Sequence, residues 1–307
     1  MWFNKTMSIK SDHHKFKTLH QFFMKFFPSI DFNEFISKED IKQAFDLLIS
    51  TKDTLDPQIY MQLALGLAHA SVLQTGGPFG TVIVNDQGSL AFGANHVTRF
   101  CDPTEHGEIN AIRNAEENNV NIDGATLYTS CYPCPMCYGK AKEVGIKQIV
   151  YCNTESDAEK YGGFNDQIFW KEVNGLPSIA DSGKESSKFK LFDHKITLDP
   201  NGADISTLIR DYCKQNQSFE PDQLSINIFE DEVIILSLYE YTAIRWAGLQ
   251  FPKETKVFLK PFQKNDLYQS EDVHSKNYGI EIFRYFQNQG NDYGQIKDHS
   301  NLKNIDG

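Results

Sequence analysis

The pattern of apolar and polar positions is clearest between residues 55 and 200, where helical and extended segments alternate. A helix is predicted to open at Asp56-Pro57 and to end at Gly76-Gly77. Its apolar face includes Ile59, Leu63, Gly66, Leu67 and Ala70. The segments TVIVND and SLAFGANHV then predict a hairpin across Gln87-Gly88.

The remaining segments of this region continue the alternation. ATLYTS, KQIVYC and KFKLFDHKITL are predicted to be strands, and helices are predicted over residues 103–117 and 135–144. Gly145 is expected to stop the second of these helices. Strand–helix–strand alternation predicts an α/β fold, in which helices cover the faces of a sheet.

Two further regions flank this segment, and they suggest a division into residues 1–54, 55–220 and 221–307. The first is aromatic-rich and predicts a helical N-terminal arm, with a helix over residues 38–49 that packs on the core. The last is a C-terminal extension of unknown role. Within it, residues 230–247 fit a helix, although VIILSLYEY could equally be a strand. Residues 287–307 are polar and predict a mobile tail.

Composition and charge narrow the class of protein. The 307 residues are 40% hydrophobic and 23% charged, which is typical of a globular protein. No apolar run is long enough for a membrane helix and no secretory signal is recognisable, so we expect a cytoplasmic protein. The net charge of −11 disfavours a nucleic-acid partner and favours a small, uncharged substrate.

Two short motifs carry the candidate chemistry: HGE at residues 106–108 and PCPMC at residues 133–137. A catalytic zinc takes three protein ligands and keeps one position open for water. His106, Cys134 and Cys137 supply one imidazole and two thiolates, which leaves Glu108 to transfer protons. The combined pattern H-x-E…P-C-x-x-C is the signature of zinc deaminases.

The predicted placement of these residues supports a metal site. Cys134 and Cys137 lie three residues apart at the start of a predicted helix, where the electropositive N-terminus favours thiolates. Two alternatives are a redox pair and a structural zinc with Cys131 as fourth ligand. Cys131 is instead expected to end a strand with its side chain in the core. An inactive, zinc-held interaction module is the alternative from another class, although it would have no use for Glu108.

Together with GGPFGTVIV, GANHVT, DPTEHGEINAIRNA, LYTSCYPCPMC and GGFNDQIFWKEV, these motifs resemble the cytidine deaminase superfamily, and within it the bacterial guanine deaminases. The resemblance covers about residues 55–175 and continues more weakly to about 220. It implies a three-layer α/β/α fold with a mixed sheet, and Zn²⁺ as cofactor. It also implies a homodimer, which in the guanine branch forms by exchange of C-terminal segments.

The same resemblance implies an activity and a set of roles. The activity is hydrolysis of a purine nucleobase, guanine to xanthine plus ammonia, with guanosine, another aminated purine or tRNA adenosine as alternative substrates. Phe79 would pack on the substrate ring, Asn95 would read the base edge, and Asp166 would contact guanine and assist Glu108. Each also has a simpler interpretation: Phe79 as core, Asn95 as a turn residue and Asp166 as a loop acid.

Three positions depart from the family pattern close to the motifs. Gly107 stands where Ala is usual, and it is a candidate substrate-binding position because it would enlarge the floor of the pocket beside the metal. Glu105 replaces a small residue, and Tyr132 replaces a Glu. These changes keep the metal and proton chemistry intact but leave the identity of the substrate open.

Overall fold

The computed structural model of the protein describes residues 57–73, 75–100, 102–178, 233–246, 251 and 256–288. The predicted arm with its helix at 38–49, the strand predicted at KFKLFDHKITL and the end of the polar tail lie outside these residues. The domain boundaries at 54/55 and 220/221 also lie outside them and stay predictions.

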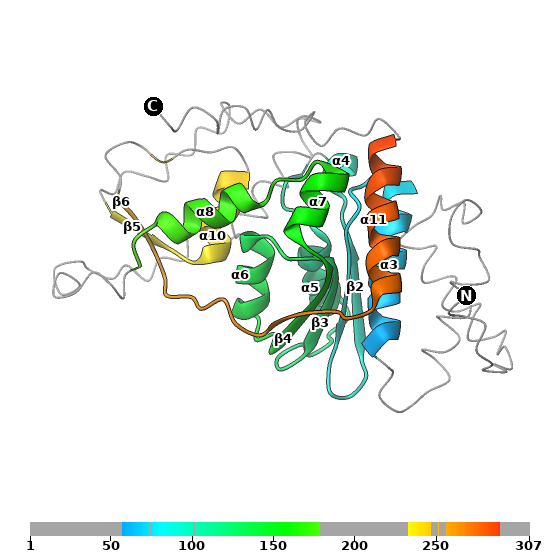
Figure 1. The fold of residues 1–307 in the computed structure, drawn as a ribbon. Helices are drawn as coiled ribbons and strands as arrows, with labels where there is room; N and C mark the ends of the chain where they lie inside the picture. Colours follow the sequence, from blue (N-terminus) through cyan, green and yellow to red (C-terminus); the bar gives the residue numbers. More distant parts are fainter. Residues whose placement is uncertain are drawn as a thin grey trace, which may run out of the picture.

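A five-stranded mixed sheet forms the centre of the fold, in the order β2-β1-β3-β4-β7 (Figure 1). β1 (Gly80–Val84) pairs antiparallel with both β2 (Leu90–Ala94) and β3 (Thr126–Cys131). β4 (Gln148–Asn153) and β7 (Leu267–Gln269) then continue the sheet in parallel with β3. The α/β mixed sheet predicted from the sequence is therefore confirmed.

Helices cover both faces of this sheet (Figure 1). On one face α3 (Pro57–Leu73) and α11 (Val273–Asn288) pack against each other and against the strands, and α7 (Glu155–Gly162) packs on α11. On the other face lie α5 (Gly107–Glu117) and α6 (Pro135–Glu143), with α8 (Gln167–Gly175) and α10 (Leu238–Trp246) packed on α6. The predicted three-layer arrangement is thus confirmed.

Alternation along the central strands divides the interior into two apolar cores. Ile83 and Leu127 point into the core beneath α5 and α6, whereas Val82 and Tyr128 point into the core beneath α3 and α11. This is the two-residue period of a strand with both faces buried. The two cores thus share the same strands.

The first helix of the metal motif begins later than its pattern predicts. Residues 103–106 form a turn, in which the amide and hydroxyl of Thr104 donate to Oδ1 of the buried Asp102 at 2.8 and 2.7 Å. α5 therefore starts at Gly107, and His106 is its N-cap residue. The expectation of a helix from residue 103 was wrong because the Asp102 side chain binds the backbone in place of the helix.

The second strand of the hairpin also ends earlier than expected. SLAFGANHV leaves the sheet at Ala94, and residues 97–100 form the short helix α4 (Val97–Phe100). The side-chain oxygen of Asn95 accepts from the amides of Gly77 and Val97 at 3.2 and 3.1 Å, which turns the chain at this point.

The ambiguous segment at residues 230–247 contains both a strand and a helix. β5 (Val233–Leu236) pairs in parallel with β6 (Lys256–Leu259) in a separate two-stranded sheet, and α10 follows at once. Ser237 separates them: its amide donates to Glu240 at 2.7 Å and its hydroxyl accepts from the Glu240 amide at 3.2 Å. This reciprocal cap starts the helix. None of the described helices has the length and apolar character needed to span a membrane.

Candidate functional site

The ends of two helices bring the three candidate metal ligands together. His106 is the N-cap residue of α5, Cys134 is the N-cap residue of α6, and Cys137 lies in the first turn of α6. Nδ1 of His106 lies 3.6 Å from Sγ of Cys134 and 3.5 Å from Sγ of Cys137, and all three residues are buried.

These distances fit a bound zinc ion. A tetrahedral zinc with ordinary bonds to nitrogen and sulfur holds those two atoms about 3.5 Å apart. The three ligand atoms lie within 4.8 Å of one another, so His106, Cys134 and Cys137 can hold one metal ion between them. The fourth position of the tetrahedron is then left for water or substrate.

The electrostatics of the cysteine pair favour a negative charge at this point. Burial alone would raise the pKa of the Cys134 thiol, but a hydrogen bond from Cys137 and the nearby His106 hold that pKa well below its usual value. Burial and the adjacent Cys134 raise the pKa of Cys137. Two helix N-termini point at the same place, which further favours an anionic sulfur.

Cys131 lies apart from this group. It ends β3, is 4% exposed, and its Sγ donates to the carbonyl oxygen of Thr154 at 3.7 Å. Burial raises the pKa of its thiol. A four-ligand structural zinc that includes Cys131 is therefore disfavoured by the arrangement of the side chains.

Glu108 is buried in the first turn of α5, and its carboxyl group interacts with Cys134 and Cys137 at the start of α6. Its Oε1 accepts a hydrogen bond of 3.0 Å from the hydroxyl of Thr129 on β3, which fixes the carboxyl group. Burial raises the pKa of this carboxyl, and the charge of Cys134 raises it further. A carboxyl with a raised pKa can both accept and return a proton near neutral pH.

Asp166 immediately precedes α8, and its carboxyl group is enclosed by protein although the residue as a whole is partly exposed. Burial raises the pKa of this carboxyl to about 7, the charge of Cys134 adds to the shift, and His106 opposes it. The carboxyl also interacts with Glu108. The structure thus brings Asp166 to the same cluster as the candidate metal ligands.

Phe79 and Asn95 lie side by side at the open end of the hairpin, where the backbone N–H of Asn95 donates to the carbonyl oxygen of Phe79 at 2.9 Å. The half-buried ring of Phe79 meets Phe164 and Phe283 edge-on, at centroid distances of 4.8 and 5.7 Å. A Cβ atom added to Gly107 would lie 3.4 Å from the Phe79 carbonyl oxygen. These three candidate substrate positions are therefore neighbours, and the oxygen of Asn95 also holds the local turn.

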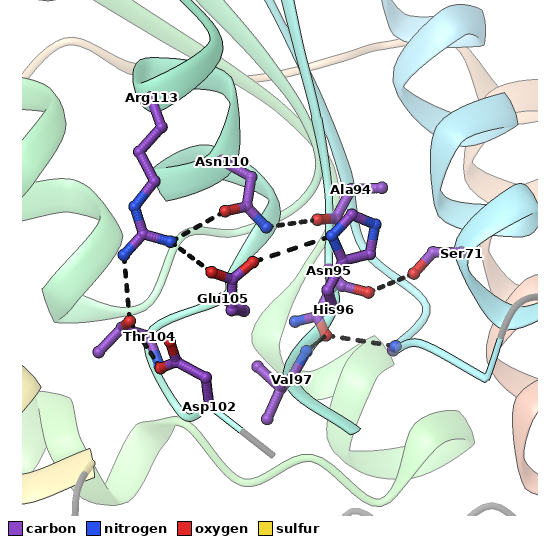
Figure 2. Close-up of polar contacts among 11 residues, drawn as sticks. Ser71, Ala94, Asn95, His96, Val97, Asp102, Thr104, Glu105, Asn110 and Arg113 are labelled. Carbon is purple, nitrogen blue, oxygen red and sulfur yellow. Dashed lines mark hydrogen bonds and ion pairs between the residues drawn. The ribbon is translucent and has the colours of Figure 1, made fainter. Parts of the chain in front are cut away.

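Figure 2 shows a polar network that the sequence did not reveal. Arg113 donates to Glu105 at 2.8 Å and to the side-chain oxygen of Asn110 at 3.0 Å, and Asn110 donates to the carbonyl oxygen of Ala94 at 2.9 Å. The network ties the turn that carries His106 to the end of β2. The signal in the sequence was Glu105 itself, a charged residue at a usually small position with Arg113 two helical turns beyond.

Tyr132 is surrounded by aromatic rings where the family pattern has a carboxylate. Its ring meets Tyr151 and Trp170 at centroid distances of 4.9 and 6.3 Å. Nζ of Lys264 lies 4.9 Å from the Tyr132 ring centroid and 3.7 Å from that of Trp170. The substitution therefore exchanges an acidic group for a cation–aromatic contact.

Trp246, at the end of α10, reaches the centre from a part of the chain without any recognisable motif. Its ring meets the His106 imidazole edge-on at 5.0 Å and stacks on Phe169 at 4.5 Å. Nothing in the sequence near residue 246 signals this contact, because it joins positions that are 140 residues apart only in the folded chain.

Comparisons with known proteins agree with the geometry of the site. The family model for the cytidine and deoxycytidylate deaminase zinc-binding region matches residues 55–153. Guanine deaminase of Bacillus subtilis is 39% identical over 123 residues, which are 39% of this chain and 78% of that enzyme. A tRNA-specific adenosine deaminase of Buchnera aphidicola is 33% identical over 104 residues, or 33% of this chain and 64% of the relative.

A further relative and a solved structure complete this picture. tRNA(Ile)-lysidine synthase of Deinococcus deserti matches at 35% identity over 34% of this chain, but over only 20% of its own length. The X-ray structure of the Bacillus subtilis guanine deaminase shares 38% identity and covers 40% of this chain and 80% of that chain, with a TM-score of 0.37. The expected family and its zinc cofactor are confirmed: this chain belongs to the cytidine deaminase superfamily of zinc-dependent hydrolytic deaminases.

Proposed function

We propose that this protein hydrolyses the exocyclic amine of a purine nucleobase, and that guanine is converted to xanthine and ammonia. The observation that carries the proposal is the meeting of three elements at one point. The starts of α5 and α6 supply the ligand set, and two carboxyl groups with raised pKa, Glu108 on α5 and Asp166 at the start of α8, interact electrostatically with it. The 39% identity to a bacterial guanine deaminase supports the choice of substrate.

Each protein group has a defined task in this reaction. His106, Cys134 and Cys137 would hold the zinc, which when bound lowers the pKa of water so that a nucleophile is available near neutral pH. Glu108 accepts a proton from that water and delivers it to a nitrogen of the purine ring. The amine-bearing carbon, C2 of guanine, gains the water oxygen and loses its amine, which leaves as ammonia after Glu108, assisted by Asp166, protonates it.

Recognition of the base is assigned to the neighbours of this centre. Phe79 packs against the purine ring, and the aromatic contacts with Phe164 and Phe283 hold it in place. Asn95 faces the base edge from a fully buried position. In its ionised form Asp166 accepts from the ring N–H or the exocyclic amine of guanine, whereas the same carboxylate would meet the acceptor N1 of adenine. A buried polar group without a partner costs about 1–3 kcal/mol, so adenine should react on the order of ten- to a hundredfold more slowly.

A tRNA adenosine is the second candidate substrate, favoured by the 33% identity to a tRNA-specific adenosine deaminase. The net charge of −11 works against it, because binding of a phosphate backbone depends on basic groups. We expect only weak, salt-sensitive tRNA binding and no inosine formation.

The test is a substrate panel with the zinc-loaded full-length chain. Guanine, guanosine, adenine, cytosine and a tRNA with an editable adenosine are incubated in parallel, with ammonia and the product bases measured. Glu108→Gln is the control for contaminating activity. Guanine should be the best substrate; an adenine or cytosine compound that reacts faster would refute the guanine assignment.

A further inference from the structure

Trp246 contacts the imidazole of the candidate ligand His106 directly. The two rings meet edge-on, with centroids 5.0 Å apart and planes inclined at 69°, and both residues are buried. This is a favourable arrangement for two aromatic rings, since the edge of one lies on the face of the other. The contact with Trp246 restricts rotation of the imidazole ring about the Cβ–Cγ bond of His106.

Orientation of this imidazole decides whether a metal can bind. Nδ1 faces the two cysteine sulfurs, so the other ring nitrogen, Nε2, points away from the metal position. A metal-binding histidine usually donates from that second nitrogen to a carboxylate or carbonyl, which fixes the ring. Among the described residues Nε2 of His106 is buried and has no hydrogen-bond partner. The orientation of the His106 ring therefore depends on packing, whereas in other metal-binding histidines a hydrogen bond from the second ring nitrogen fixes it.

Trp246 is itself held firmly by contacts with α8. Its ring stacks on Phe169, with centroids 4.5 Å apart and planes inclined at 23°. The preceding residue, Arg245, donates to Glu172 at 2.7 Å, and the hydroxyl of Tyr241 donates to the same carboxylate oxygen at 2.5 Å. Two side chains of α10 thus converge on one acid of α8, which fixes the end of the helix that carries Trp246.

α10 also lies directly against the helix that carries the cysteines. A Cβ atom at Gly139 of α6 would come within 2.6 Å of the Tyr239 amide nitrogen, so the two backbones approach as closely as a glycine permits. The same helix therefore contacts α6 through Gly139 and the N-cap of α5 through Trp246. These are the two elements that the metal has to hold in register.

We propose that Trp246 is a positioning residue for the metal centre: its ring holds the His106 imidazole so that Nδ1 faces the sulfurs of Cys134 and Cys137. The proposal concerns metal binding and is independent of which base the enzyme deaminates. It assigns a role to α10, which lies outside the segment matched by the family model.

The test measures zinc affinity of the full-length chain by competition with a chromophoric chelator, and the visible spectrum of the cobalt-substituted protein. Trp246→Ala should weaken zinc binding by about 10- to 100-fold, the effect typical of losing the group that orients a metal-binding histidine. The intensity and position of the cobalt bands should change with it. Trp246→Phe keeps a ring against the imidazole and should restore most of the affinity.

Two further variants separate positioning from general destabilisation. Phe286→Ala removes a large buried ring from the core beneath α3 and α11, and it should lower the melting temperature while leaving zinc affinity and the cobalt spectrum unchanged. Trp246→Leu fills part of the volume of the tryptophan side chain without an aromatic ring. If Trp246→Ala does not fold, the zinc affinity of Trp246→Leu tests the positioning role. Wild-type zinc affinity in Trp246→Leu, or an equal loss in Phe286→Ala, would overturn the proposal.

Discussion

The two faces of the sheet bury different kinds of side chain, although both faces are formed by the same strands. The face covered by α5, α6 and α10 encloses the candidate metal ligands and Glu108 within its apolar core. The face covered by α3 and α11 buries a cluster of aromatic rings that pack at tilted angles, among them Phe164, Phe283 and Phe286. The difference teaches that substitutions on the first face should alter metal binding and turnover. Substitutions on the second face should mainly alter stability, except where they touch Phe79, the proposed substrate-packing ring.

The largest effect is expected for Glu108→Gln on the metal-bearing face. Glutamine keeps the shape and can still accept from Thr129, but it cannot shuttle protons, so turnover should fall by on the order of 10²–10⁴. Zinc content and melting temperature should stay close to those of the wild-type chain, as measured by elemental analysis and thermal denaturation. Unchanged turnover would show that the proton-transfer role belongs to another group.

Asp166→Ala tests the second carboxyl on the same face. Loss of its acceptor should reduce kcat/KM for guanine by on the order of ten- to a hundredfold, since a buried base edge would lose its partner. Chelator competition should show little change in zinc affinity. Asp166→Asn is the matched variant that keeps the size of the side chain, and a zinc affinity that fell as far as the activity would contradict a substrate role.

Two glycine substitutions compare the faces most directly. Gly139→Ala forces the added methyl against the backbone of Tyr239 on α10, and Gly279→Ala forces it against Asn153 and Leu65 beneath α11. Each should cost about 1–3 kcal/mol of unfolding free energy, measured in urea. Only Gly139→Ala should also weaken zinc binding, because Gly139 lies on α6, the helix that carries the two cysteines, at the point where α10 packs on it. Equal zinc affinities in the two variants would contradict the expectation that only the face with α6 and α10 affects metal binding.

The smallest effect is expected at the cap of α7, which packs on α11. The amide and hydroxyl of Thr154 donate to Asp157 at 2.9 and 2.7 Å, and the Asp157 amide donates back at 3.1 Å. Thr154→Ala should cost about 1 kcal/mol at neutral pH without any change in turnover. Thr154→Ser keeps the cap and serves as the control.

The cap should also depend on pH in a defined direction. Burial alone would raise the pKa of Asp157, but hydrogen bonds from Thr154 and the charge of Lys276 lower it below its usual value. A carboxyl with a lowered pKa in the folded state stabilises the fold above its ordinary pKa of about 4, and this contribution is lost as the pH falls through the folded value. The difference between wild type and Thr154→Ala should therefore shrink in acid. A difference that grew in acid would contradict this account.

The sequence revealed the metal centre more completely than the elements around it. HGE and PCPMC are local patterns that place a ligand beside the proton-transfer carboxyl and two thiolates on one helical turn, so they can be recognised without the fold. Trp246 could not be found this way because its partner lies on another helix and no periodicity marks it. The segment at 230–247 gave an ambiguous pattern because a buried strand and a buried helix meet at Ser237 without a loop between them.

β7 has a consequence for how the molecule is made. All the candidate metal ligands precede residue 138, but the strand that covers the edge of β4 comes from residues 267–269, with more than a hundred residues between. During synthesis from the N-terminus, β4 is therefore an unpaired edge strand until β7 has been made, and it can pair with a strand of another chain. Contacts so distant in sequence close slowly. The nascent chain can thus gather its zinc ligands while its sheet is still incomplete, and the interval before β7 docks is the period in which it is most exposed to mispairing.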